Sequence, residues 1–227
     1  DITPERLGIT TAQLCELLAT VPASTTLAEM EAMAATVGAG AWYAEMHARD
    51  IGDKFPRITA DFPISLRRRF VFGLAEQDRV SAIVDFLAAG DVSTAFELVR
   101  ISHAGDYDTE VSEQELAALA QFQITDPRAR LAFIPGGYGR MTDAYDRVVT
   151  TLNDFLSSHG SDAGAIQRLG AGWGGNVGGL ISRRFLQGED RLALERLVTE
   201  ELGLPPLDLE HSIATPGAGA CLLSSPS

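Results

Sequence analysis

The chain has 227 residues, 45% of them apolar, which is enough to bury the core of one large or two small domains. Its net charge of −13, without a basic face, argues against nucleic acid and anionic membranes as partners, and no apolar run is long enough for a spanning helix. Cys15 and Cys221 lie far apart, which favours free thiols over a single disulfide. With no signal peptide, a cytoplasmic location is expected. Because the chain begins at Asp1 without Met, we expect a fragment or a trimmed product.

Residues 1–63 are predicted to form a helical lead-in. Apolar residues at helical spacing predict a helix over residues 11–21, which Pro22 ends. Thr26 and Glu29 have the spacing of a capping box and open a second helix. His47 follows in a short segment without a clear partner, so it is interpreted as a surface or core histidine.

The longest predicted helix covers residues 65–89. Its apolar stripe has a period of 3.6 and is expected to face the core; it comprises Leu66, Phe70, Leu74, Val80, Val84 and Leu87. Gln77 lies on this stripe and needs a hydrogen-bond partner if it is buried. The basic run at residues 67–69 is interpreted as a cap or a solvated face. Gly90 then ends the helix and Asp91 caps the next one, which predicts a helical hairpin.

The region that follows is more polar. Asp106, Asp108 and Glu110 alternate along a loop, and we interpret them as solvated acids, so no metal site is predicted. Ser112 and Glu115 predict a capped short helix, and another helix is predicted from Thr142 to about residue 157.

The last part of the chain patterns as strand, glycine-rich loop, strand, helix, strand, turn and strand. The first two strands, residues 164–169 and 177–182, enclose the loop. A dinucleotide-binding fingerprint would need a helix after the loop, so that alternative is disfavoured. A helix at 189–202 and strands at 207–213 and 220–223 complete the pattern. The predicted fold is therefore α+β, with a helical layer packed on a four-stranded, mostly antiparallel sheet.

Three motifs resemble the GHMP small-molecule kinases, and the galactokinase branch in particular. The loop Gly170-Ala171-Gly172-Trp173-Gly174-Gly175 is similar to their third signature, T-G-A-G-[FW]-G-G-C, with Leu169 in place of Thr and Asn176 in place of Cys. Glu76-Gln77-Asp78-Arg79-Val80 resembles E-N-x-R-V, and Gly90-Asp91 and Ser102-His103 follow as G-D and S-H do in that branch. Of the family's S-x-P-E-L-D motif, residues 141–146 retain only the Thr142 cap and Asp146.

The resemblance covers residues 64–223 and implies that the chain, residues 1–227, is the C-terminal domain of an ATP-dependent sugar 1-kinase. Such an enzyme transfers the γ-phosphate of ATP to the anomeric hydroxyl of a monosaccharide such as galactose, arabinose or galacturonate. ATP and Mg²⁺ would be bound mainly by an N-terminal ATP-binding domain that this chain lacks, so the chain alone is expected to be inactive. The surface that meets that domain is expected to be partly apolar and prone to self-association.

The same resemblance assigns roles to a few residues. Gly170, Ala171, Gly172, Trp173, Gly174 and Gly175 would support the phosphate loop, and Ser102, His103 and Tyr138 are candidate substrate-side residues. No catalytic residue is assigned. Two alternatives stay open: a non-catalytic regulatory protein of this fold that binds a sugar or ATP, and an unrelated α+β domain with a structural glycine turn.

Overall fold

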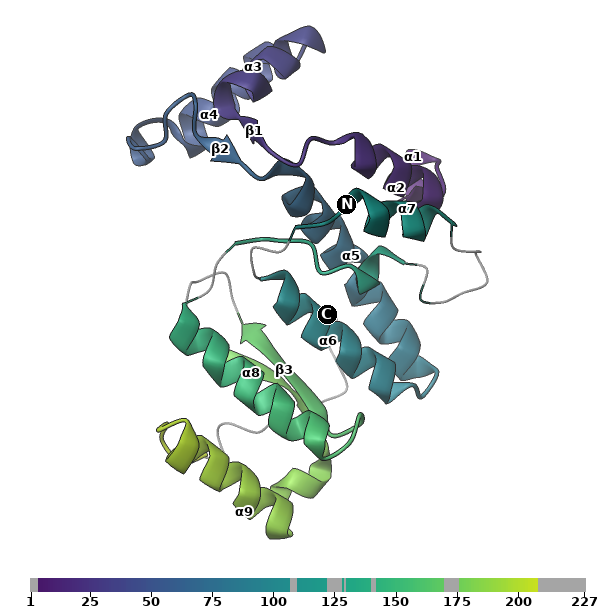
Figure 1. Cartoon of the computed structure of the whole chain (residues 1–227), viewed down its shortest axis with the longest axis vertical. Helices are drawn as coiled ribbons and strands as arrows, with labels where there is room; N and C mark the ends of the chain where they lie inside the picture. Colours follow the sequence, from purple (N-terminus) through teal and green to yellow (C-terminus); the bar gives the residue numbers. More distant parts are fainter. Residues whose placement is uncertain are drawn as a thin grey trace, which may run out of the picture. The chain divides into compact units, whose positions relative to one another are not determined.

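The computed structural model describes residues 4–106, 110–121, 128, 130–139, 142–169 and 176–207, and the chain divides into two units, residues 1–180 and 181–227. Figure 1 shows the elements. In chain order they are α1 (Pro4–Leu7), α2 (Thr11–Thr20), β1 (Thr25–Thr26), α3 (Leu27–Thr36), α4 (Gly40–Asp50), β2 (Pro63–Ile64), α5 (Leu66–Ala88), α6 (Val92–Gly105), α7 (Glu113–Gln121), the short turn η2 (Leu131–Phe133), α8 (Asp143–Ser158), β3 (Gly164–Leu169), β4 (Asn176–Ile181) and α9 (Gly188–Arg196).

The helical hairpin of α5 and α6 is confirmed, with the turn at the predicted residues. Gly90 adopts a φ of 80°, which L side chains avoid. The Asp91 carboxylate accepts a hydrogen bond of 3.0 Å from the backbone N–H of Thr94 and so caps α6. The two helices lie side by side and pack against each other (Figure 1).

The face of α5 that is buried differs from the one predicted. Val71, Ala75 and Ala82 are fully buried, whereas the predicted core stripe is exposed over most of its length: Phe70 by 48%, Val80 by 66%, Val84 by 61% and Leu87 by 39%. The small residues allow α6 and η2 to approach the helix closely, and this packing decides the face.

Two arginines at the start of α5 are also buried, so their interpretation as a solvated face or cap was wrong. Arg67 and Arg68 are each 7% exposed. The Nε atom of Arg67 donates to the carbonyl oxygen of Val21 at 2.7 Å, and its NH2 group lies 3.3 Å from the Glu113 carboxylate. A guanidinium can be buried in this way because it finds several acceptors at once.

A core cluster joins α2, α5 and α7 in the first unit. It contains Leu14, Cys15, Leu18, Val71, Ala75, Val111, Leu116, Leu119, Leu131 and Ile134. Burial of a leucine or valine side chain contributes about 1.5–3 kcal/mol each, so this cluster dominates the stability of that region. The two predicted capping boxes, Thr26 with Glu29 and Ser112 with Glu115, both form their reciprocal hydrogen bonds.

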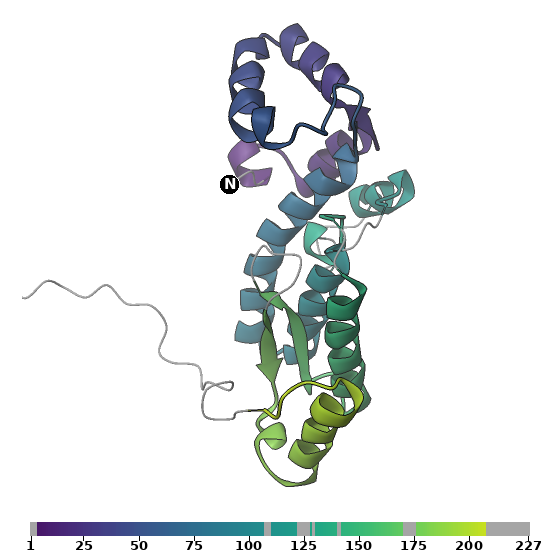
Figure 2. The same ribbon diagram turned by 90° about the vertical axis from the view of Figure 1, so that its left-hand side faces the viewer.

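Within the described residues the strands form two small sheets of two strands each, and the predicted four-stranded sheet is not shown. β1 pairs with β2 in antiparallel register, with Thr25 opposite Ile64, and β3 pairs with β4 as an antiparallel hairpin. α6 and α8 both pack against β3 (Figure 2). The strands predicted at 207–213 and 220–223 fall almost entirely outside the described residues, so within the described part of the chain the structure is α+β but mostly helical.

The second unit contains α9 and the turns on either side of it. The helix predicted at 189–202 is confirmed. α9 begins at Gly188, and a π-helical segment over Leu197–Glu201 continues it. Phe185, Leu194, Leu197 and Val198 are buried. In the described residues of both units, no helix is long and apolar enough to span a bilayer.

Candidate functional site

The glycine-rich loop that carries the strongest motif, residues 170–175, lies outside the described residues, but both of its stems are described. β3 ends at Leu169 and β4 begins at Asn176, and the two strands pair with each other. The residues after the loop are therefore a strand, as predicted, and not the helix that a dinucleotide-binding fingerprint requires. Because a hairpin fixes where its connection emerges, the groups around the stems define the candidate site.

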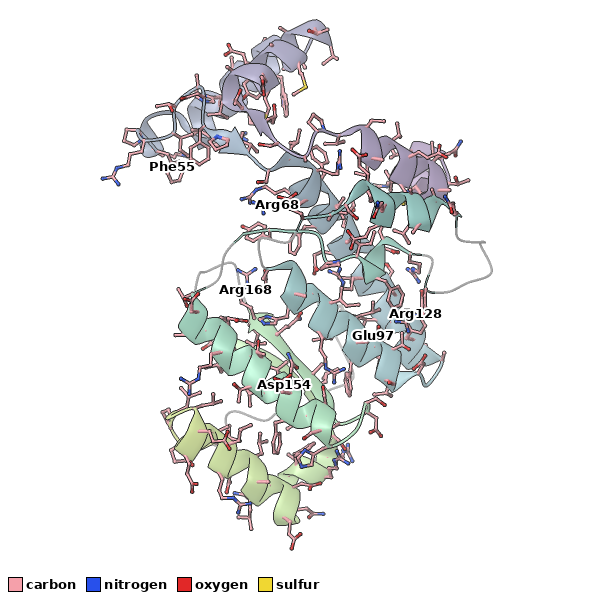
Figure 3. The ribbon with its side chains drawn as sticks, in the orientation of Figure 1. Phe55, Arg68, Glu97, Arg128, Asp154 and Arg168 are labelled. Carbon is pink, nitrogen blue, oxygen red and sulfur yellow. The ribbon has the colours of Figure 1, made fainter. Side chains whose placement is uncertain are left out.

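The first stem is attached to α6 through a buried ion pair. The Nε atom of Arg168 donates to Oδ2 of Asp106 at 3.1 Å, and its NH2 group donates to Oδ1. The two side chains are only 12% and 9% exposed. Figure 3 shows Arg168 at the end of the sheet, near α6. A bidentate pair of this kind fixes direction as well as distance, so it orients the strand that leads into the loop.

Asp106 is one of the acids that the sequence suggested to be solvated, and that interpretation was wrong. It is 7% exposed and follows directly on the last residue of α6. Burial raises the pKa of the Asp106 carboxyl, and the charges of Arg168, His103 and Arg79 act in the opposite direction. The carboxylate is therefore held by surrounding cations, as a buried anion must be.

The second stem is attached to α8. The hydroxyl of Tyr145, on the first turn of α8, donates to the carbonyl oxygen of Asn176, the first residue after the loop. Burial raises the pKa of Tyr145. Further along α8, the Asn153 side chain donates to the carbonyl oxygen of Ile166 and accepts from its N–H, both at 2.8 Å. Both strands of the hairpin are thus tied to one helix.

The residues of the E-x-x-R and S-H motifs contact one another in space. Oγ of Ser102 donates to Oε2 of Glu76 at 3.0 Å, and Oε1 of Glu76 pairs with Arg79. Arg79 is 1% exposed and donates to the carbonyl oxygens of Ala132 and Ile134 at 2.9 and 2.8 Å. Burial lowers the pKa of Arg79 to about 10. This network connects α5 to α6, to η2 and to Ile134, the residue after η2.

The other two candidate substrate-side residues, His103 and Tyr138, contact the end of α6 or the side chains around it. Nε2 of His103 is 3.3 Å from Oδ1 of Asp146, and this histidine is only 6% exposed. The ring of Tyr138 lies beneath the guanidinium of Arg168, at 5.6 Å. The backbone N–H of Tyr138 donates to the carbonyl oxygen of Gly105 at 2.8 Å. Tyr138 is 40% exposed, so of the three candidates it presents the most surface to a ligand.

Sequence reasoning missed Arg168, Asp106 and Asn153 as functional or positioning residues. The signal that could have found Arg168 is a charge on the strand immediately before the glycine loop. Its acceptor is 62 residues away in sequence, however, and no local pattern connects the two. Asn153 lies on the buried face of a helix, where an amide needs partners, and this could have marked it.

Possible metal ligands and cavities elsewhere in the described residues add nothing to this site. Across the part of the chain that the structure describes, no three His, Cys, Asp or Glu side chains converge to hold a metal ion. A cavity of about 260 Å³ lies between α3, α4 and the segment before β2, lined by Leu27, Ala28, Glu31, Tyr43, Ala44, His47, Ile58 and Ala60. None of the motif residues contributes to this cavity.

Comparison with known proteins adds no relative to this picture. No family model, no curated protein and no solved structure matches the chain.

Proposed function

We propose that the chain is the C-terminal part of an ATP-dependent, galactokinase-like sugar kinase. The enzyme would transfer the γ-phosphate of ATP to the anomeric hydroxyl of a monosaccharide. The observation that carries the proposal is the contact between Ser102 and Glu76, and between Glu76 and Arg79. These residues come from two motifs that were matched separately in sequence, and the helical hairpin joins them in one network.

The arrangement around the loop stems fits what such an enzyme needs from this half. Phosphoryl transfer depends mainly on positioning and on charge neutralisation, so a loop beside the phosphates must be held firmly. Asp106 with Arg168 fixes one stem and Tyr145 fixes the other. Tyr138 is 40% exposed beside Arg168, and its aromatic side chain would contact a sugar ring.

ATP would supply the transferred phosphoryl group and Mg²⁺ would neutralise its charge. Because the described residues offer no metal-binding cluster, we assign no step to Mg²⁺ through this chain. We assign the binding of ATP and Mg²⁺ to an N-terminal domain of the complete enzyme. The residues described here hold the loop and contribute to one wall of the sugar site.

The test is an assay of ADP release with galactose, arabinose and galacturonate, applied to the 227-residue chain and to the product of the complete reading frame. We expect the complete protein to release ADP with one of these sugars and the 227-residue chain to release none. Turnover by the chain alone at the rate of the complete protein would contradict the proposal. Sugar binding without turnover by the complete protein would instead favour the regulatory alternative.

The glycine loop is tested in the complete protein by Gly172→Val. We expect this change to lower kcat far more than it lowers Tm, because a side chain in a loop beside the phosphates displaces either the phosphates or the sugar. A lower Tm with unchanged activity per folded molecule would show that the loop has only a structural role.

A further inference from the structure

The cavity between α3, α4 and the segment before β2 has walls that hydrogen bonds hold in place. α3 and α4 are neighbours (Figure 1). The hydroxyl of Tyr43, on α4, donates to the carbonyl oxygen of Leu27, on α3, at 3.2 Å, and Tyr43 is buried. The backbone N–H of Ala28 donates to the carbonyl oxygen of Ala60, in the segment before β2, at 2.9 Å. The three sides of the cavity are therefore tied to one another, as in a site that is formed before its ligand enters.

The size and the walls of this cavity suit a small molecule with an apolar part. Its volume is about 260 Å³, slightly below the roughly 300–1,000 Å³ that is typical of sites for drug-sized ligands. Leu27, Ile58 and three alanines supply aliphatic walls. The rings of Tyr43 and His47, whose centroids lie 6.2 Å apart, supply an aromatic wall.

The cavity also carries a carboxylate without a counter-ion. Glu31 is the only acid among the residues that line it, and no lysine or arginine lines it. Burial and the negative charge of Glu31 both raise the pKa of Tyr43, so the carboxylate acts on the ring that forms the wall. Within the described residues, the Glu31 carboxylate has no hydrogen-bond or ion-pair partner. The carboxylate of Glu29, by contrast, is used by the capping box of α3.

We propose that this cavity binds a small primary amine in its ammonium form, with the amine carried on an apolar group. The ammonium pairs with the Glu31 carboxylate and lies against the ring of Tyr43. The His47 imidazole, in its neutral form, accepts a further hydrogen bond, since an ammonium has three donors to satisfy. The apolar group fills the space between Leu27 and Ile58, where it is removed from water.

The charge of the cavity selects a cation over other ligands of the same shape. A carboxylate or phosphate group would face Glu31 in a chain whose net charge is −13, and like charges repel each other. A neutral alcohol can fill the apolar part of the cavity but forms no ion pair. None of the lining residues belongs to the motifs on which the proposed kinase activity rests, so this proposal is independent of that activity.

Isothermal titration calorimetry of the 227-residue chain at about pH 7 tests the proposal with three probes of one scaffold. These are 2-phenylethylamine, which is a cation, 2-phenylethanol, which is neutral, and phenylacetate, which is an anion. We expect the amine to bind at least about tenfold more tightly than the alcohol, and phenylacetate to show no binding up to about 10 mM. Absence of amine binding up to about 10 mM, or equal affinities for the amine and the alcohol, would overturn the proposal.

Variants of the chain locate the binding site. Glu31→Gln should raise the dissociation constant of the amine at least about tenfold and leave that of the alcohol unchanged, because it removes the charge but keeps the size of the side chain. Glu45→Gln is the matched control, at an exposed residue of α4 that does not line the cavity, and should bind the amine as the wild type does. Amine binding that is the same in Glu31→Gln and in the wild type would contradict the assigned ion pair.

Ala44→Leu tests the cavity itself, because the larger side chain fills part of the space that the apolar group needs. Ala44 lies on α4 and is exposed, so circular dichroism should show the fold unchanged. We expect this variant to lose binding of both the amine and the alcohol. Amine affinity that is retained in Ala44→Leu would place the binding site outside the cavity and overturn the proposal.

Discussion

Arg168 and Asp106 show how one buried ion pair can fix the end of a strand to a helix. Moving either charge out of water is costly, and the two side chains compensate each other through a bidentate contact. If one partner is removed, the other remains buried and uncompensated. The two residues should therefore behave as a single unit when they are changed.

This unit is tested by Arg168→Met, Asp106→Leu and the double variant in urea unfolding. We expect each single change to lower the free energy of unfolding by about 3–5 kcal/mol, and the double change to cost much less than their sum. Arg49→Met is the control, because Arg49 and its partner Asp50 are both exposed, and it should leave the free energy of unfolding essentially unchanged. Additive single effects would mean that the pair is not coupled.

Cys15 gives a prediction for pH. Burial raises the pKa of its thiol from 9.0 to about 11. The unfolded chain loses this proton at lower pH than the folded chain, so the contribution is complete below pH 9 and is lost as pH rises through 11. Cys15→Ala removes this titration.

The difference in unfolding free energy between the wild type and Cys15→Ala should therefore fall by about 1–3 kcal/mol from mildly to strongly alkaline pH. Urea unfolding of both proteins across this range measures it. Since all other titrating groups are shared, they cancel in the difference. A difference that stays constant with pH would indicate a thiol that water reaches in the folded chain.

At the scale of elements, the β3–β4 hairpin depends on two adjacent glycines that differ in what surrounds them. A Cβ on Gly179 would lie 1.9 Å from the carbonyl oxygen of Ala165, which is backbone and cannot move without breaking the pairing. A Cβ on Gly178 would lie 2.5 Å from the end of the Leu169 side chain. Leu169 is 51% exposed, so its side chain has room to turn away.

We therefore expect Gly179→Ala to destabilise the chain by about 2 kcal/mol or more and Gly178→Ala by less than about 1 kcal/mol. Thermal unfolding of the two variants gives a direct comparison, because the substituted glycines are adjacent in the same strand. Equal effects would imply that the strands adjust their separation and that the hairpin is not closely packed at Gly179.

At the scale of the whole molecule, the net charge of −13 acts on any self-association. Two copies repel each other at long range, and salt screens that repulsion over a Debye length of about 10 Å at 0.1 M. Attraction between copies that comes from apolar contact is not weakened by salt. Raising the ionic strength should then favour self-association of the chain.

Sedimentation at about 0.05 M and 0.5 M salt checks this expectation, and we expect the dissociation constant to fall about three- to tenfold. A dissociation constant that rises with salt would show that ion pairs, rather than apolar contact, hold the copies together.

The sequence by itself determined the local features. The helical hairpin, the capping boxes and the strand on each side of the glycine loop were predicted correctly, because spacing and capping act over a few residues. The contact of Thr26 with Glu29 needs only one turn of helix to form.

The tertiary structure decided which face of α5 is buried and which charges are paired. The spacing of Phe70, Val80 and Val84 predicts an amphipathic helix with these residues in the core, but all three are exposed in the folded chain. The carbonyl oxygens that accept from Arg79 and the carboxylate that accepts from Arg168 lie more than 50 residues away, and only the folded chain brings them together. Charged side chains can be buried where such distant acceptors exist. The local sequence pattern then wrongly predicts that these side chains are exposed to solvent.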